Sequence, residues 1–358
     1  MRPRSDVDQI KALLQDRIVD LVHTLAPGGV IKGNYWLSRS PARNDRHAGS
    51  FWVTIRHTPK GPPGVWKDEG TGDKGDVFSL IQLHYGWPHT RDGFIEAVKW
   101  ARKWLNFEDI PVKQRAAVAE QAAATRAREE KDAAEKAEKN ARAAKAWWLS
   151  CEPELAGTVA ETYLGSRGIP LADLKRPPRV LRFAPELVHG PSQRTFPAIV
   201  AAMTDAAGAI RAVHRTYLAP DGSGKAPVSP ARMIWPTFAG CVIRLTRGET
   251  DLSPEEATRR GLVDRLLICE GIEDGLSFAL ACPELRIWAA GSLANLANVK
   301  LPDCTWEVIV AADNDWGKPQ AQAQLQRALE ALGRQRRPVR VARSHIGKDA
   351  NDALRGAA

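Results

Sequence analysis

Length, composition and charge exclude several classes of protein. The chain has 358 residues, enough for two or three domains, with 44% hydrophobic and 26% charged residues. A formal net charge of +9 favours a polyanionic partner, although basicity alone is weak evidence of one. No apolar run reaches the roughly 18 residues of a membrane span, and the polar start lacks a signal-peptide core. We therefore expect a cytoplasmic protein with no membrane partner.

Residues 1–108 are predicted to form one small domain. An amphipathic helix over 10–22 leads into a Gly-rich segment at 27–33. Short strands are expected next and two helices at the end; these elements cover 34–37, 50–55, 64–67, 76–85 and 94–105.

Residues 109–147 differ abruptly from what precedes them. They are rich in Ala, Glu, Lys, Arg and Gln and contain almost no large apolar side chain to bury. This composition predicts an exposed helix or a partly frayed linker, and the absence of a Leu or Ile heptad makes a coiled coil less favourable. Trp147 and Trp148 mark the return to a packed domain.

The remaining chain is divided into a middle part, 148–262, and a C-terminal part, 263–358. The middle part mixes short helices with strands at 198–203, 210–217 and 242–245. The C-terminal part alternates strands with helical segments, which predicts an α/β fold with a mostly parallel sheet covered on both faces. Its strands are expected at 266–269, 287–290, 308–312 and 339–342, with helices at 273–281 and 319–332 and a shorter helical or loop piece at 293–299.

The cysteines give no sign of a disulfide or zinc framework. They are far apart and contain no CxxC pair, so we expect reduced thiols, most of them in the core: Cys151, Cys241, Cys269, Cys282 and Cys304.

Acidic residues follow two of the predicted C-terminal strands. In open α/β sheets ligands bind beyond the carboxyl ends of the strands, and Gly271 would permit a tight turn there. Carboxylates gathered at that edge suit Mg²⁺, which takes one or two of them together with water and phosphate oxygens. The residues concerned are Glu270 and Asp274 after the first strand, Asp313 and Asp315 after the third, and Asp349 and Asp352 after the last.

Structural roles for single members of this set are common. Asp352 is a candidate helix N-cap, Asp274 a candidate first-turn residue, and a lone Asp-x-Asp is often structural. The occurrence of all three acidic groups, each after a strand, favours function for the set as a whole.

These motifs resemble the Toprim domain of bacterial-type primases, topoisomerases, nucleases and recombination-mediator proteins. The EGIED sequence at 270–274 matches the glutamate motif of that family, DND at 313–315 matches its Asp-x-Asp motif, and KDAND at 348–352 is similar to a further acidic motif of primases. The resemblance implies catalytic roles for Glu270, Asp313 and Asp315. It also implies Mg²⁺ or Mn²⁺ held by these residues and Asp349, with Asp274 and Asp352 as secondary acids.

A basic segment precedes the acidic motifs. Residues 210–218 and 225–230 resemble the small subdomain before Toprim in bacterial-type primases, where a strand ending in Arg leads to a Lys-containing loop and a Ser-Pro turn. The resemblance implies that Arg215, Lys225 and Lys348 contact a nucleoside triphosphate or DNA phosphates. A β-hairpin with exposed basic residues is the structural alternative.

The N-terminal domain resembles the zinc-ribbon-like domain of those primases in the order of its elements, but no cysteine precedes Cys151. Because a zinc site needs about four Cys or His ligands, and only His47 and His57 are nearby, we expect the fold without zinc. Aromatic residues are expected to form a core in its place, or in part to stack on template bases: Trp36, Phe51, Trp52 and Trp66.

The resemblance as a whole implies a primase-like nucleotidyltransferase of phage or plasmid type that makes short RNA primers from ribonucleoside triphosphates on a single-stranded DNA template. No GxxxxGK[ST] pattern is present, so a replicative helicase is expected to act as a separate protein. The alternatives are a Toprim nuclease and a non-catalytic single-stranded DNA-binding accessory protein. A topoisomerase is less favoured because it needs a tyrosine nucleophile, and none of the four tyrosines lies in a recognisable context.

Overall fold

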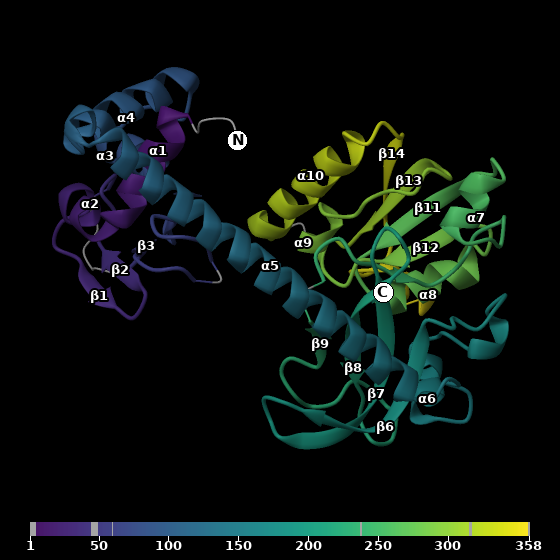
Figure 1. Cartoon of the computed structure of the whole chain (residues 1–358). Coiled ribbons are helices and arrows are strands. Elements are labelled where there is room, and N and C mark those ends of the chain that lie inside the picture. The colour runs from purple at the N-terminus through teal and green to yellow at the C-terminus, as the bar shows by residue number, and fades with distance from the viewer. Residues whose placement is uncertain (1–4, 44–48, 59, 237, 315–316, 357–358) are drawn as a thin grey trace. The chain divides into compact units, whose positions relative to one another are not determined.

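The computed structural model describes residues 5–43, 49–58, 60–236, 238–314 and 317–356. The chain divides into an N-terminal unit, Met1–Asp132, and a C-terminal unit, Ala133–Ala358 (Figure 1). Within the described ranges, no helix has the length and apolar character needed to cross a membrane.

The N-terminal unit is an antiparallel sheet with helices packed on one face. The strands follow one another across the sheet in the order β1-β2-β3-β4-β5. Its elements are α1 (Asp6–Asp16), α2 (Ile18–Leu25), β1 (Val30–Lys32), β2 (Tyr35–Ser38), β3 (Phe51–Thr54), β4 (Trp66–Asp68), β5 (Lys74–Gly75), α3 (Val77–Tyr85), α4 (Arg91–Trp104) and a 3-10 turn at Phe107–Asp109.

Two expectations for this unit need correction. The single helix expected over 10–22 is two helices, because the backbone leaves the helical conformation at Arg17 (φ −101°, ψ 30°). The Gly-rich segment contains strand β1, whose three exposed residues pair with β2. Alternation of apolar and polar residues could not reveal this edge strand in the sequence, because neither of its faces is buried.

Aromatic side chains fill the core of this unit. Trp36, Phe51 and Trp66 are at most 2% exposed, and the rings of Phe51 and Trp66 stack at 5.5 Å. Trp52 lies outside that core cluster, beneath the ammonium of Lys60 at 4.2 Å from the ring centroid. Three of the four aromatics therefore occupy the core position that the sequence predicts.

Of the two histidines considered as zinc ligands, His47 is outside the described residues. His57 Nδ1 is paired with Glu129 Oε2 at 2.8 Å. The likeness of this unit to a zinc ribbon, and the absence of zinc, stay predictions.

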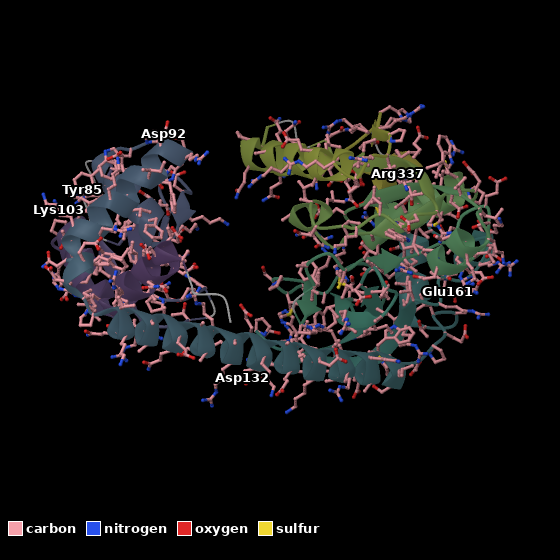
Figure 2. The ribbon with its side chains drawn as sticks, turned by 45° about the horizontal axis from the view of Figure 1, so that its top comes forward. Tyr85, Asp92, Lys103, Asp132, Glu161 and Arg337 are labelled. Atoms are coloured by element: carbon pink, nitrogen blue, oxygen red, sulfur yellow. The ribbon has the colours of Figure 1, made fainter. Side chains whose placement is uncertain are left out.

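Helix α5 (Val112–Ser150) covers the segment expected to be an exposed helix or linker. Most side chains between 127 and 139 are exposed, and Figure 2 shows Asp132 projecting from the helix. Buried positions lie toward the helix ends, at Ala119, Ala141 and Ala144. Apart from the ion pairs of Glu129 with His57 and of Glu138 with Arg211, the middle of α5 is therefore held mainly by its own hydrogen bonds.

We expect limited trypsin digestion to cut first in the middle of α5, at Arg128, Lys131, Lys136 or Lys139, and to release two folded fragments. The reason is that local unfolding of this stretch exposes almost no apolar surface. Mass spectrometry of the first fragments checks the prediction. First cleavage outside 127–140 would show that other contacts protect the helix.

The C-terminal unit begins with an antiparallel sheet in the strand order β6-β7-β8-β9. Strands β7 and β8 confirm the strands expected at 198–203 and 210–217, and they pair with each other as an antiparallel hairpin. The elements are α6 (Val159–Ser166), a 3-10 turn (Leu171–Asp173), β6 (Leu181–His189), β7 (Arg194–Thr204), β8 (Ile210–Tyr217) and β9 (Arg232–Trp235).

A second sheet follows, and its order is β10-β12-β11-β13-β14. Strand β10 is antiparallel to β12, while β12, β11, β13 and β14 are parallel, which confirms the mostly parallel α/β sheet. The elements are β10 (Ile243–Arg244), α7 (Pro254–Arg259), β11 (Asp264–Cys269), α8 (Ile272–Ala281), β12 (Arg286–Ala289), α9 (Leu293–Leu296), β13 (Thr305–Ala312), α10 (Pro319–Gly333), β14 (Val339–Arg343) and α11 (Ala350–Leu354).

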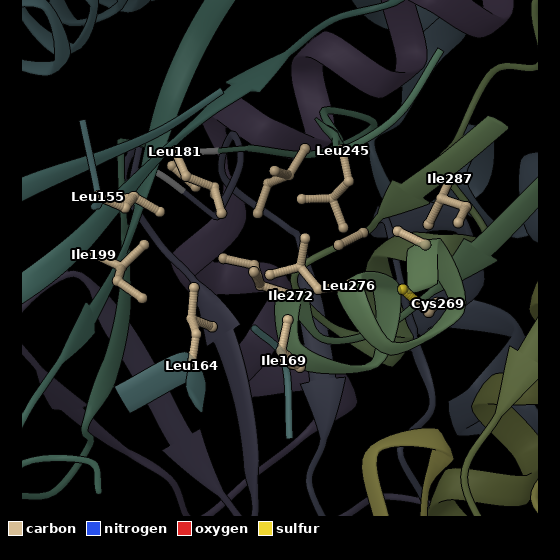
Figure 3. Close-up of a cluster of buried hydrophobic side chains, with 14 of the residues drawn as sticks. Leu155, Leu164, Ile169, Leu181, Ile199, Leu245, Cys269, Ile272, Leu276 and Ile287 are labelled. Atoms are coloured by element: carbon tan, nitrogen blue, oxygen red, sulfur yellow. The ribbon is translucent and has the colours of Figure 1, made fainter. Parts of the chain in front are cut away.

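Alternate residues of β11 face two different cores. Leu266 and Ile268 pack with residues of α9 and α10, whereas Leu267 and Cys269 pack with α8 and with the first sheet. The second of these cores is continuous from β6 and α6 to α8 and β12 (Figure 3). The two sheets of the C-terminal unit therefore share one hydrophobic core, which fixes the side chains of one sheet relative to those of the other.

All five cysteines, each within the described part of the chain, are free thiols. Four are buried and Cys282 is half-buried, which confirms the expectation that most of them lie in the core.

Candidate active site

A cavity of about 190 Å³ opens at the carboxyl ends of β11 and β13. It combines residues from the parallel sheet with residues from the antiparallel sheet and α6. Its lining is formed by Arg167, Lys225, Arg232, Glu270, Gly271, Glu273, Asp274, Asp313, Lys348 and Asp349.

One wall of the cavity is acidic. Glu270 directly follows β11, and Asp313 directly follows β13. Asp274 is in the first turn of α8, and Asp349 is the N-cap of α11, where its Oδ1 accepts the Asp352 N–H at 2.9 Å. Four of the acidic residues that the sequence singles out therefore lie together, as expected because ligand sites in open α/β sheets form at the carboxyl ends of the strands.

The crowding of these carboxylates affects the pKa of Asp274. Burial raises the pKa of Asp274, and the neighbouring negative charges of Asp349 and Asp313 raise it further, to about 7. Its Oδ1 accepts one hydrogen bond, from the Asn351 N–H at 3.2 Å. A cation bound among these groups would relieve the repulsion.

Gly271 has a different role from the one expected. Its φ of −98° is open to any residue, so the turn does not require glycine. A Cβ at this position would lie 2.9 Å from Asp274 Oδ2. Glycine therefore leaves room for the Asp274 carboxylate, which would have to shift if a side chain were present at position 271.

Glu273 lies next to Asp274 in sequence but in opposite surroundings. Its Oε1 is 2.7 Å from Lys225 Nζ and accepts a hydrogen bond of 2.7 Å from the Tyr163 hydroxyl. Burial would raise its pKa, but the charge of Lys225 and these hydrogen bonds lower it to about 2. Glu273 is therefore a carboxylate whose charge is already compensated within the protein.

The segment between β14 and α11 contacts the Asp313 loop directly. Lys348 Nζ is 3.1 Å from Asp313 Oδ2. The Asn314 N–H donates to Lys348 O at 2.8 Å, and the Asn314 side-chain amide donates to Ser344 O and Gly347 O. Two acidic motifs separated by more than thirty residues in the sequence are thus held side by side.

Three basic residues of the cavity lining come from other elements, and they are called the basic wall below. Lys225 is from the loop after β8, Arg232 begins β9, and Arg167 caps the end of α6. Sequence reasoning identified Lys225 but missed Arg167, Arg232 and the role of Glu273. The only available signal for Arg232 was its place just after the Ser-Pro turn at 229–230.

Two described residues singled out by the sequence, Arg215 and Asp352, are not in the cavity lining. Arg215 lies over the ring of Trp147, with its guanidinium carbon 5.4 Å from the ring centroid. Asp352 accepts the Lys348 N–H through Oδ2 at 3.0 Å and so stabilises the loop. Asp315 lies outside the described residues.

The acidic wall has the chemistry that a magnesium ion requires. Its potential ligands are all hard carboxylate oxygens, and their mutual repulsion favours a cation. In the described residues no three His, Cys, Asp or Glu side chains are gathered closely enough to hold a metal by themselves. Mg²⁺ commonly takes only one or two carboxylates and completes its shell with water and phosphate oxygens, so the donor set fits.

A parallel α/β sheet with acidic residues at the carboxyl ends of adjacent strands defines the class of this domain, and residues 265–358 match the model of the Toprim domain. This stretch of the chain is a Toprim domain, as its motifs imply. Residues 138–245 match a domain of unknown function, DUF7146. No curated protein matches the chain.

Several solved structures are similar in part. The catalytic domain of DnaG primase bound to single-stranded DNA has 16% identity and a TM-score of 0.41, over 63% of this chain and 76% of that one. A DNA primase domain from Pseudomonas aeruginosa has 15% identity and a TM-score of 0.37, over 61% and 74%. The catalytic core of E. coli primase has 18% identity and a TM-score of 0.37, over 59% and 73%.

Proposed function

We propose that the protein is a Mg²⁺-dependent primase-type nucleotidyltransferase. It would join ribonucleotides into short RNA primers on single-stranded DNA during replication of phage or plasmid type, with the helicase as a separate partner. The proposal rests on the Toprim domain and on one observation above all: acidic residues of that domain and basic residues from the preceding part of the chain line a single cavity.

That arrangement suits transfer of a nucleotidyl group. The bond formed joins the 3′ oxygen of one nucleotide to the α-phosphorus of the next, and pyrophosphate leaves. A divalent cation on the acidic wall would stabilise the charge that develops on the phosphate oxygens. Arg167, Lys225 and Arg232 would bind the triphosphate, and Glu270 would accept the 3′ hydroxyl proton or complete the metal site.

The test is to incubate the full chain with single-stranded DNA, labelled ribonucleoside triphosphates and Mg²⁺. We expect short labelled oligomers that require both template and metal. Degraded template without oligomers would favour the Toprim nuclease instead. Salt-sensitive DNA binding with neither product would favour the non-catalytic accessory protein.

A further inference from the structure

Lys225 contacts a buried carboxylate, that of Glu273. This carboxylate has no part in the chemistry proposed above. Lys225 Nζ and the Tyr163 hydroxyl both contact Oε1 of Glu273, each at 2.7 Å. The Glu273 side chain is 8% exposed, whereas that of Lys225 is 34% exposed. The Lys225 ammonium therefore lies between the buried Glu273 and Tyr163 side chains and the open cavity.

The backbone of Lys225 is fixed by the same elements. Lys225 forms an isolated bridge with Leu218, which closes a tight loop after β8. Gly222 at the tip of this loop has a φ of +73°, and a Cβ there would lie 2.8 Å from Thr162 Cβ on α6. The loop therefore rests directly on α6, the helix that also carries Tyr163.

We propose that Glu273, supported by Tyr163, is a positioning residue that orients the Lys225 ammonium toward a phosphate group of the nucleoside triphosphate. The inference rests on the proposed function of the cavity. A lysine side chain has many rotamers, and a lysine ordered in advance loses less conformational freedom when phosphate binds. Because Glu273 already accepts two hydrogen bonds inside the protein, it acts through Lys225.

Charge and positioning predict opposite results for Glu273→Gln. Removal of a negative charge makes the cavity more positive, so electrostatics alone predicts tighter binding of a triphosphate. Loss of orientation predicts weaker binding. The sign of the change in nucleotide affinity therefore distinguishes the two effects. In a variant that stays folded, a lower stability alone would not weaken nucleotide binding.

The experiment measures the dissociation constant of ATP, in the presence of a chelator and again with Mg²⁺, by equilibrium binding to the full chain. We expect Glu273→Gln to weaken binding about tenfold and Tyr163→Phe to weaken it less. Lys225→Met should weaken binding at least as much as Glu273→Gln. The double variant should be no weaker than Lys225→Met alone, because Glu273 acts only through Lys225.

Glu307→Gln is the matched control. Glu307 is also a buried glutamate paired with a more exposed cation, Arg340 Nε at 2.6 Å, but it lies at the start of β13, away from the cavity. Its ATP affinity should equal that of the wild type. Circular dichroism verifies folding, and if Glu273→Gln does not fold, Tyr163→Phe and its double variant with Lys225→Met decide the question.

Unchanged or tighter ATP binding by Glu273→Gln, or an additive double variant, would overturn the inference. So would a wild-type protein that does not bind ATP. ATP binding that depends on Lys225 and Glu273 in a protein that makes no oligomers would support the inference while it refutes the proposed polymerase function.

Discussion

Asp313→Asn should reduce Mg²⁺-dependent oligomer synthesis by at least about a hundredfold, because the carboxylate that we propose faces the metal and the phosphates loses its charge. Folding should be almost unchanged or slightly improved. The substitution preserves shape, and it removes one of the charges that raise the pKa of Asp274. The initial rate of labelled oligomer formation and the unfolding midpoint check both parts.

Asp303→Asn is the control for this variant. Asp303 is exposed in the loop before β13, at the other end of the strand from Asp313, and its substitution should leave the rate of synthesis unchanged. Binding of single-stranded DNA should persist in Asp313→Asn, since it depends on Lys and Arg contacts to phosphate. Synthesis by Asp313→Asn at the wild-type rate would remove Asp313 from the catalytic set.

Of the substitutions proposed for this protein, Asp264→Asn should lower the free energy of unfolding the most. Asp264 Oδ2 is 2.5 Å from Arg286 Nη2, and both side chains are only 1% exposed. Asp264 also accepts hydrogen bonds from the N–H and hydroxyl of Thr250. With the carboxylate charge removed, the buried guanidinium is left uncompensated, and the free energy of unfolding should fall by about 3–5 kcal/mol. Urea unfolding of the full chain measures the change.

Glu284→Gln provides the comparison: Glu284 lies in the loop before β12 and pairs with Arg265 of β11. Glu284 Oε1 is 3.3 Å from Arg265 Nη2, and both side chains are more than 40% exposed, so the loss should stay below about 1 kcal/mol. Asp264 is at the start of β11, away from the cavity, so ATP affinity of the folded Asp264→Asn variant should match the wild type. Equal unfolding midpoints for the two variants would contradict this account of the buried pair.

The parallel sheet was predictable because its strands are short apolar runs followed by helical segments. The antiparallel sheet was harder. Strand β6 contains Pro185 and an irregular register between Ala184 and Leu187, and proline argues against a strand. Strand β9 has only four residues and no clear burial alternation. Local sequence therefore carries little information about either strand.

The acidic wall of the site was predictable for a different reason from the basic wall. Glu270 and Asp313 directly follow strands, so topology alone brings them together. Arg167 and the Tyr163–Glu273 contact depend on how α6 packs against the Toprim domain, and the latter pair is 110 residues apart in sequence. Sequence patterns reveal periodicity and strand ends, but not which distant helix completes a cavity.

Nucleotidyl transfer is tested most directly by following the α- and the γ-phosphate of the nucleotide separately. Wild-type protein is supplied with single-stranded DNA, Mg²⁺ and ribonucleoside triphosphates labelled in separate reactions at the α- or the γ-phosphorus. Nucleotidyl transfer predicts α-label in short oligomers and an equal amount of γ-label in pyrophosphate from each nucleotide added after the first. Release of γ-label as inorganic phosphate, with no α-label in oligomers, would contradict it.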